Sequence, residues 1–308
     1  VVVILVMSVQ SYIGVKSAWT VMLMASNLPF IFLYSSNLGL MQGLGRFDRY
    51  GKLVLGHAIS RLVLSYLTVL YLESVTGLML GVTLGTLLAA ILSFWLCRKD
   101  IFWNLRSSMP IPYVSFVPVF CLALIITIYG SLDVFLVRIM FTPSISGYFA
   151  TVTVLAKALL YPSLGIMTVV FPMQVQAVNE MRSSLSISLA TLVICFFISV
   201  IILSLLYFGF EVVIPITYGE DFIGAKYLFL PYGILILCVM VNVHIMHLSL
   251  AGGIENSQFV KLLASHLIVC VSSLLLSEDV VSFVTGMIIG NILILLFSIF
   301  KFVKTLDS

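Results

Sequence analysis

Charged residues stand inside long apolar runs between Leu132 and Met173, in a sequence that otherwise excludes them. Asp133, Arg138 and Lys157 are the charged residues of this stretch. A charge at the centre of a lipid bilayer costs about 2.5 to 3.5 kcal/mol on insertion scales, so such a residue usually faces a hydrated cavity or a partner charge. We therefore predict that this stretch contributes to function.

Two polar faces follow from a spacing of four residues, which places side chains on one side of a helix. They consist of His57, Arg61 and Ser65 in one segment and of Thr153, Lys157 and Tyr161 in another. Cations on such faces would attract a polar or anionic substrate into a hydrated cavity. Pro162 follows the second face and is expected to bend its helix, because proline frees a backbone carbonyl.

Each of these charges also has a simpler interpretation. Arg138 lies near the end of an apolar segment, so its side chain is expected to reach the membrane interface. Asp133 could pair with Arg61 or with Lys157, which would be a structural role as well as a functional one. We predict that Lys157 and Arg61 face one shared cavity.

A further polar group, Asn242, His244 and His247, lies in another apolar segment. The two histidines are three residues apart and would share a helix face, which is compatible with a proton relay. Polar side chains also join membrane helices through interhelical hydrogen bonds, and we favour that second interpretation. The five cysteines lack the spacing of a metal site, so no metal is expected.

The composition identifies the kind of protein that must position these side chains. Of its 308 residues, 62% are hydrophobic and 9% are charged, whereas soluble globular domains carry about 25% charged residues. The chain is therefore predicted to be an all-α bundle of membrane-spanning helices. It has no long basic run, so no nucleic-acid partner is expected, and no catalytic motif, so we predict that it is not an enzyme.

Apolar windows long enough to span a bilayer recur about ten times. The predicted spans are residues 1–15, 19–41, 53–72, 76–97, 112–137, 147–172, 185–208, 227–250, 261–276 and 280–300. Most of the 15 lysine and arginine residues fall in alternate connections, which predicts that both ends of the chain are cytoplasmic. The apolar opening lacks the features of a signal peptide and is interpreted as a helix already in progress, in a chain truncated at its N-terminus.

Three stretches together resemble the polysaccharide flippases of the multidrug/oligosaccharidyl-lipid/polysaccharide (MOP) superfamily. In the first, Asp133 in one helix is followed by Gly147-Tyr148 opening the next; the others are LMQGLGRFDRYGK at 40–52 and VVIPITYGEDFIGAKYLFLPYG at 212–233. The resemblance implies a MATE-like architecture of two six-helix lobes with the first two helices missing. It assigns residues 1–97 to a partial first lobe of four helices, 98–111 to a cytoplasmic linker and 112–308 to a second lobe of six.

The same resemblance implies a function and a place. Such a protein flips an isoprenoid-lipid-linked oligosaccharide across the cytoplasmic membrane of a bacterium or archaeon by alternating access, for O-antigen, capsule or exopolysaccharide assembly. Arg61, Lys157, Asp133 and His57 would line the substrate cavity, with no cofactor beyond a H⁺ or Na⁺ gradient. The expected partners are the lipid-linked oligosaccharide, membrane lipid and other polysaccharide-assembly proteins.

Two alternatives remain open. A drug/cation antiporter of the same superfamily would use Asp133 as its coupling site. A membrane-embedded glycan polymerase fits the composition, although it would be expected to carry a larger external loop than this sequence provides.

Overall fold

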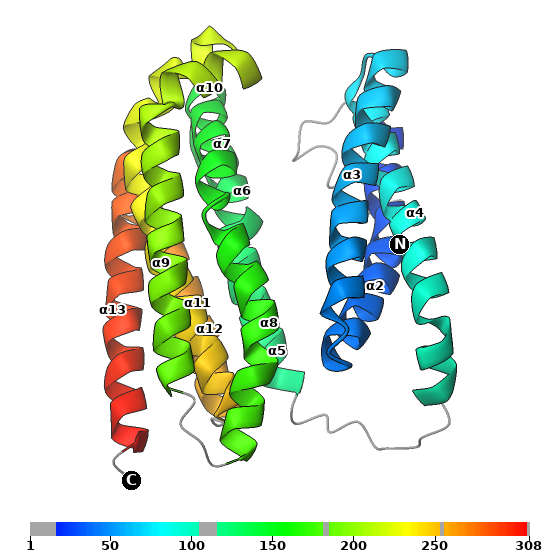
Figure 1. Cartoon of the computed structure of the whole chain (residues 1–308). Helices are drawn as coiled ribbons and strands as arrows, with labels where there is room; N and C mark the ends of the chain where they lie inside the picture. Colours follow the sequence, from blue (N-terminus) through cyan, green and yellow to red (C-terminus); the bar gives the residue numbers. More distant parts are fainter. Residues whose placement is uncertain (1–16, 105–115, 181–184, 253–255, 307–308) are drawn as a thin grey trace. The chain divides into compact units, whose positions relative to one another are not determined.

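A computed structural model describes residues 17–104, 116–180, 185–252 and 256–306. The described residues form helices and turns without any strand, which confirms the predicted all-α class (Figure 1). The chain divides into two compact units, Val1–Pro110 and Ile111–Ser308. Their assignment to the two lobes of a flippase stays a prediction.

In the described residues of the first unit, three helices pack closely. They are α2 (Ala18–Gly43), α3 (Phe47–Leu72) and α4 (Val75–Asn104). The backbones of α3 and α4 approach at three glycines of α4, Gly77, Gly81 and Gly85, where an added Cβ atom would collide with α3. Small residues at this spacing let membrane helices approach closely, so the GxxxGxxxG pattern at 77–85 indicates this packing, although it was not among the predicted features.

Polar contacts join α2 to α4 in the same unit. Asn37 donates a hydrogen bond to Ser93 Oγ over 2.9 Å, and the hydroxyls of Thr20 and Thr76 are 2.7 Å apart. All except Thr76 are buried, so these bonds satisfy polar groups that would otherwise be costly in an apolar surrounding.

The second unit is built around α11, which packs against α7, α8, α9 and α13. Its elements are α5 (Phe116–Thr127), the π-helix η2 (Ile128–Leu132), α6 (Asp133–Met140), α7 (Pro143–Lys157), α8 (Leu160–Asn179), α9 (Leu185–Phe208), α10 (Phe210–Thr217), the 3₁₀ helix η3 (Glu220–Ala225), α11 (Lys226–Ala251), α12 (Asn256–Leu275) and α13 (Val280–Leu306). Figure 1 shows α9, α11, α12 and α13 running side by side along this unit. Fully buried Phe149, Phe229, Tyr232 and Phe283 form part of its core.

Nine stretches of the described residues are long and apolar enough to cross a membrane. They correspond to the predicted spans from 19–41 onward, whereas the first predicted span, 1–15, lies outside the described residues. The predicted linker 98–111 begins inside α4, and its part from residue 105 also lies outside them. The connection between the predicted spans 185–208 and 227–250 contains the short helices α10 and η3, and the apolar Phe210 and Ile214 of α10 are buried against the core.

Candidate functional site

Two irregularities of the second unit's helices position the candidate site. In the π-helix η2 the Asp133 backbone N–H reaches back to the carbonyl of Ile128, five residues earlier, so the helix widens just before Asp133. Insertions of this kind occur often at functional sites. The second irregularity is a tight turn at Ala158 and Leu159, directly after Lys157, the last residue of α7.

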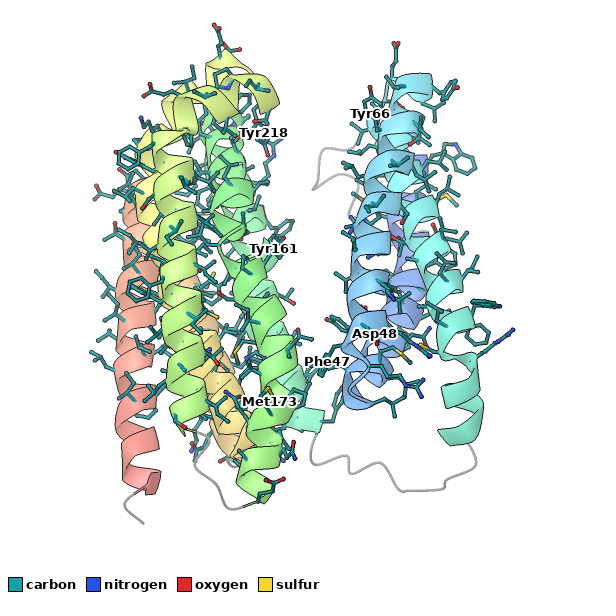
Figure 2. All side chains as sticks on the ribbon, viewed as in Figure 1. Phe47, Asp48, Tyr66, Tyr161, Met173 and Tyr218 are labelled. Carbon is teal, nitrogen blue, oxygen red and sulfur yellow. The ribbon has the colours of Figure 1, made fainter. Side chains whose placement is uncertain are left out.

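Pro162 explains that turn. Proline has no N–H to offer to the carbonyl four residues earlier, which here belongs to Ala158, so the helix cannot continue regularly through this point. The helix is interrupted between Lys157 and Leu160, and so is the polar face that was predicted to run across this point. The bend itself stays a prediction. Thr153 is buried on α7, whereas Tyr161 lies beyond the turn on α8 and is 69% exposed (Figure 2).

Asp133 and Lys157 form an ion pair inside the second unit. Lys157 Nζ lies 3.0 Å from Asp133 Oδ1 and donates a second hydrogen bond to the carbonyl of Gly130 over 3.2 Å. The Tyr232 hydroxyl on α11 donates to the other carboxylate oxygen, Asp133 Oδ2. The side chain of Asp133 is 1% exposed and that of Lys157 11%. Three separate helices thus meet at one carboxylate.

The pair is electrically neutral as a whole, which makes it tolerable in an apolar surrounding. Removing water from two charges is expensive and is compensated only when the geometry and the remaining hydrogen bonds are good. Here both carboxylate oxygens have donors, and the Val134 backbone N–H adds one more over 2.8 Å. Such a site can exchange a proton at the carboxylate or attract an anion at the ammonium.

A second polar network lies next to the ion pair. Asn291 on α13 donates to the Tyr129 hydroxyl over 2.9 Å, and Asn242 on α11 donates to Asn291 Oδ1 over 3.2 Å. Tyr129 belongs to η2 and packs edge-on against the ring of His266, with centroids 5.6 Å apart. Asn291 was a missed signal, since an amide inside an apolar helix indicates a partner. Tyr232 gave no such signal, because it pairs with a residue 99 positions away.

The predicted histidines of α11 contact different partners. His244 is buried, and its Nε2 donates to the carbonyl of Ser188 on α9 over 2.8 Å, an interhelical bond. His247 instead uses Nδ1 to donate to the carbonyl of Val243 in its own helix over 2.9 Å. A proton-relay role for these residues stays a prediction.

In the first unit, the face that carries His57 and Arg61 contacts neighbouring helices. The His57 ring lies 4.4 Å from that of Tyr34, and its Nε2 is 3.4 Å from Thr86 Oγ1. Arg61 itself is exposed, although its backbone packs against Gly85. That His57 and Arg61 line a substrate cavity, with Lys157 facing the same cavity, stays a prediction.

Arg138 is exposed and lies in the last turn of α6. Among the described residues, no group of three or more His, Cys, Asp or Glu side chains could hold a metal ion.

Comparison with known proteins identifies the fold. No protein-family model and no curated protein matches the sequence. A multidrug resistance MATE family transporter of the MOP superfamily, solved in an outward-facing conformation, superposes with a TM-score of 0.75 at 14% identity, over 100% of this chain and 75% of that one. A MOP superfamily transporter from Pyrococcus furiosus, described as having a binding pocket of reverse polarity, superposes with a TM-score of 0.77 at 16% identity. The match covers 99% of this chain and 75% of that one. The chain therefore has a MATE-like transporter fold.

Proposed function

We propose that the chain is a membrane transporter that carries an isoprenoid-lipid-linked oligosaccharide across the cytoplasmic membrane by alternating access. The observation that carries the proposal is the buried Asp133–Lys157 ion pair inside a fold shared with MOP transporters. Charged residues within membrane helices are retained mainly where a substrate or ion must pass. A purely structural bundle would not need this ion pair, because two apolar side chains at the same positions would avoid the free-energy cost of removing water from the charges.

The substrate class is supported by the chemistry of such lipids. A lipid-linked oligosaccharide has a phosphate-bearing head that needs a cation and a polyisoprenoid tail that can stay in the bilayer. Lys157 supplies an ammonium at the edge of the second unit, with 11% of its side chain exposed. The resemblance of the 40–52 and 212–233 stretches to polysaccharide flippases favours the same substrate.

A depletion experiment tests this function in a cell that assembles the glycan. Without the chain, the lipid-linked oligosaccharide should accumulate in the cytoplasmic leaflet, where an externally added lectin cannot reach it. Re-expression of the wild type should restore lectin access, and Lys157→Met should not. Lys226→Met is the matched control, since Lys226 lies in the same unit but pairs with the exposed Glu211. Normal lectin access in depleted cells would refute the proposal.

A drug/cation antiporter is the second candidate, favoured by the burial of Asp133. A carboxylate that is 1% exposed and held by two other helices could serve as the coupling site of an antiporter. In that case an ion gradient across the membrane should drive dye efflux through the chain, and Asp133→Asn should abolish this efflux. Efflux combined with normal glycan export in depleted cells would favour this candidate over the first.

A further inference from the structure

The two members of the ion pair differ in access, and this difference suggests how a ligand would bind. Asp133 is 1% exposed and enclosed by α7 and α11, whereas Lys157 is 11% exposed. The hydrogen bond from Lys157 to the Gly130 carbonyl lies at the surface. Gly130 has open space where a Cβ atom would stand. A ligand can therefore approach the ammonium from the side of Gly130 but cannot reach the carboxylate.

The net charge of the ion pair then limits which ligands can bind. The pair is neutral, so a phosphate group arriving at Lys157 would leave one uncompensated negative charge in an apolar surrounding, which is very costly. A proton on Asp133 removes that excess. Lys157 would meanwhile stay oriented, because its bond to the Gly130 carbonyl does not depend on Asp133.

Among the described residues of the second unit, the groups next to Asp133 leave Lys157 as the cation for this role. Tyr129, Tyr232 and Cys270 lie within electrostatic reach of Asp133, and none of them carries a positive charge at neutral pH. His266 on α12 packs against Tyr129, and its Nδ1 donates to the carbonyl of Leu262. Asn291 on α13 contributes only an amide.

We propose that a phosphate group of the substrate replaces Asp133 as the counter-ion of Lys157, and that Asp133 takes up a proton from water in the same step. Lys157, Asp133 and the phosphate group that contacts the ammonium are then neutral together when that group carries one negative charge, and one proton is taken up for each ligand bound. This mechanism rests on the proposed function and adds its coupling: an anionic headgroup binds together with a proton, and Na⁺ has no part at this site because Lys157 already occupies the cation's place.

Calorimetry of the chain in nanodiscs tests this coupling. Binding is measured in two buffers of different ionisation enthalpy, which gives the protons taken up per ligand bound. Inorganic pyrophosphate and farnesyl pyrophosphate are the two probes, so that binding of a free anion is distinguished from binding of a lipid headgroup. The difference between the wild type and Asp133→Asn cancels the protons that the phosphates themselves exchange. Sulfate, which exchanges none near neutral pH, gives the count for the wild type alone if the variant does not fold.

The wild type is expected to take up about one proton more per ligand than Asp133→Asn, since a single carboxylate changes its state. Lys157→Met should weaken binding about 10-fold to 100-fold, the range for a lost hydrogen bond to a charged group. Lys226→Met should change neither quantity. Equal proton counts in wild type and Asp133→Asn, with sulfate also binding without a proton, would overturn the mechanism, as would undiminished binding by Lys157→Met or displacement of the ligand by Na⁺.

The result separates this inference from the proposed function. If cells show glycan export that depends on the chain while calorimetry shows no proton uptake, the coupling is wrong and the transporter remains. If depletion leaves glycan export normal, the proposed function fails whatever the proton count is.

Discussion

Replacing Gly81 with alanine tests the close packing of α3 on α4 in the first unit. A Cβ atom at position 81 would lie 2.3 Å from Ser65 Cα and 2.5 Å from Ser65 N. These are backbone atoms, so no side-chain rotation relieves the contact, and the helices must separate by roughly 1.2 to 1.7 Å to restore a normal carbon–carbon distance. Overpacking of this kind typically costs about 1 to 3 kcal/mol.

Gly56→Ala is the matched control on the opposing helix. Gly56 lies inside α3 with nothing within 4 Å of its added Cβ atom. Both substitutions gain the same helix propensity of about 0.5 to 1 kcal/mol, which cancels when the two variants are compared. We therefore expect Gly81→Ala to be about 1 to 3 kcal/mol less stable than Gly56→Ala.

Tryptophan fluorescence during unfolding in mixed micelles of rising SDS content measures this difference. All 3 tryptophans of the chain, at positions 19, 95 and 103, belong to the first unit, so their emission reports on that unit. Stabilities of the two variants that agree within about 0.5 kcal/mol, the range of neutral substitutions, would refute the close packing.

Three further predictions concern the second unit. In a double-mutant cycle, Lys157→Met alone should destabilise the chain by about 3 to 5 kcal/mol, because it leaves the buried Asp133 carboxylate unpaired. Asp133→Asn alone should cost less, because Lys157 is partly exposed and keeps its bond to the Gly130 carbonyl, and the double variant should lose less than the sum. Additive losses in SDS unfolding would contradict the ion pair. Asn291→Leu should cost about 1 to 2 kcal/mol in the same assay, because it removes interhelical hydrogen bonds, and an unchanged midpoint would contradict that network. The hydrogen bond and charge of Lys226 hold the pKa of exposed Glu211 below its ordinary value, so this pair stabilises the chain above that ordinary pKa and loses its effect as the pH falls through the lowered one. Melting temperatures of wild type and Glu211→Gln should thus differ slightly at neutral pH and converge in acid; a difference that grows in acid would disprove the linkage.

The helices were predictable because hydrophobicity over about 20 residues is a local property of the chain. Pro162 also indicated an irregularity in its helix, because the missing N–H acts within one helical turn, and the helix is interrupted at residues 158–159. The close approach of α3 and α4 was encoded in Gly77, Gly81 and Gly85 and could have been found by looking for small residues at a spacing of four.

The composition of the candidate site was only partly predictable. Asp133 and Lys157 stood out because charge in an apolar run is rare, and their pairing had been one of two possibilities. Choosing between Arg61 and Lys157 as the partner of Asp133 required knowledge of how α7 packs against the π-helix. No residue type predicts a π-helix at this point. Tyr232 contacts the Asp133 carboxylate from α11, a helix that is distant in the sequence. Tyrosine is too common in membrane proteins for its presence to have predicted this contact.

Transport by the purified chain in liposomes tests directly whether it moves a lipid-linked oligosaccharide across a membrane. The wild-type chain, Lys157→Met and Lys226→Met are reconstituted into liposomes that contain a fluorescent lipid-linked oligosaccharide, and arrival of the sugar in the outer leaflet is followed by a membrane-impermeant quencher. We predict rapid arrival with the wild type and with Lys226→Met, and arrival no faster than in protein-free liposomes with Lys157→Met. Equal rates for wild-type and protein-free liposomes, or full activity of Lys157→Met, would contradict the account.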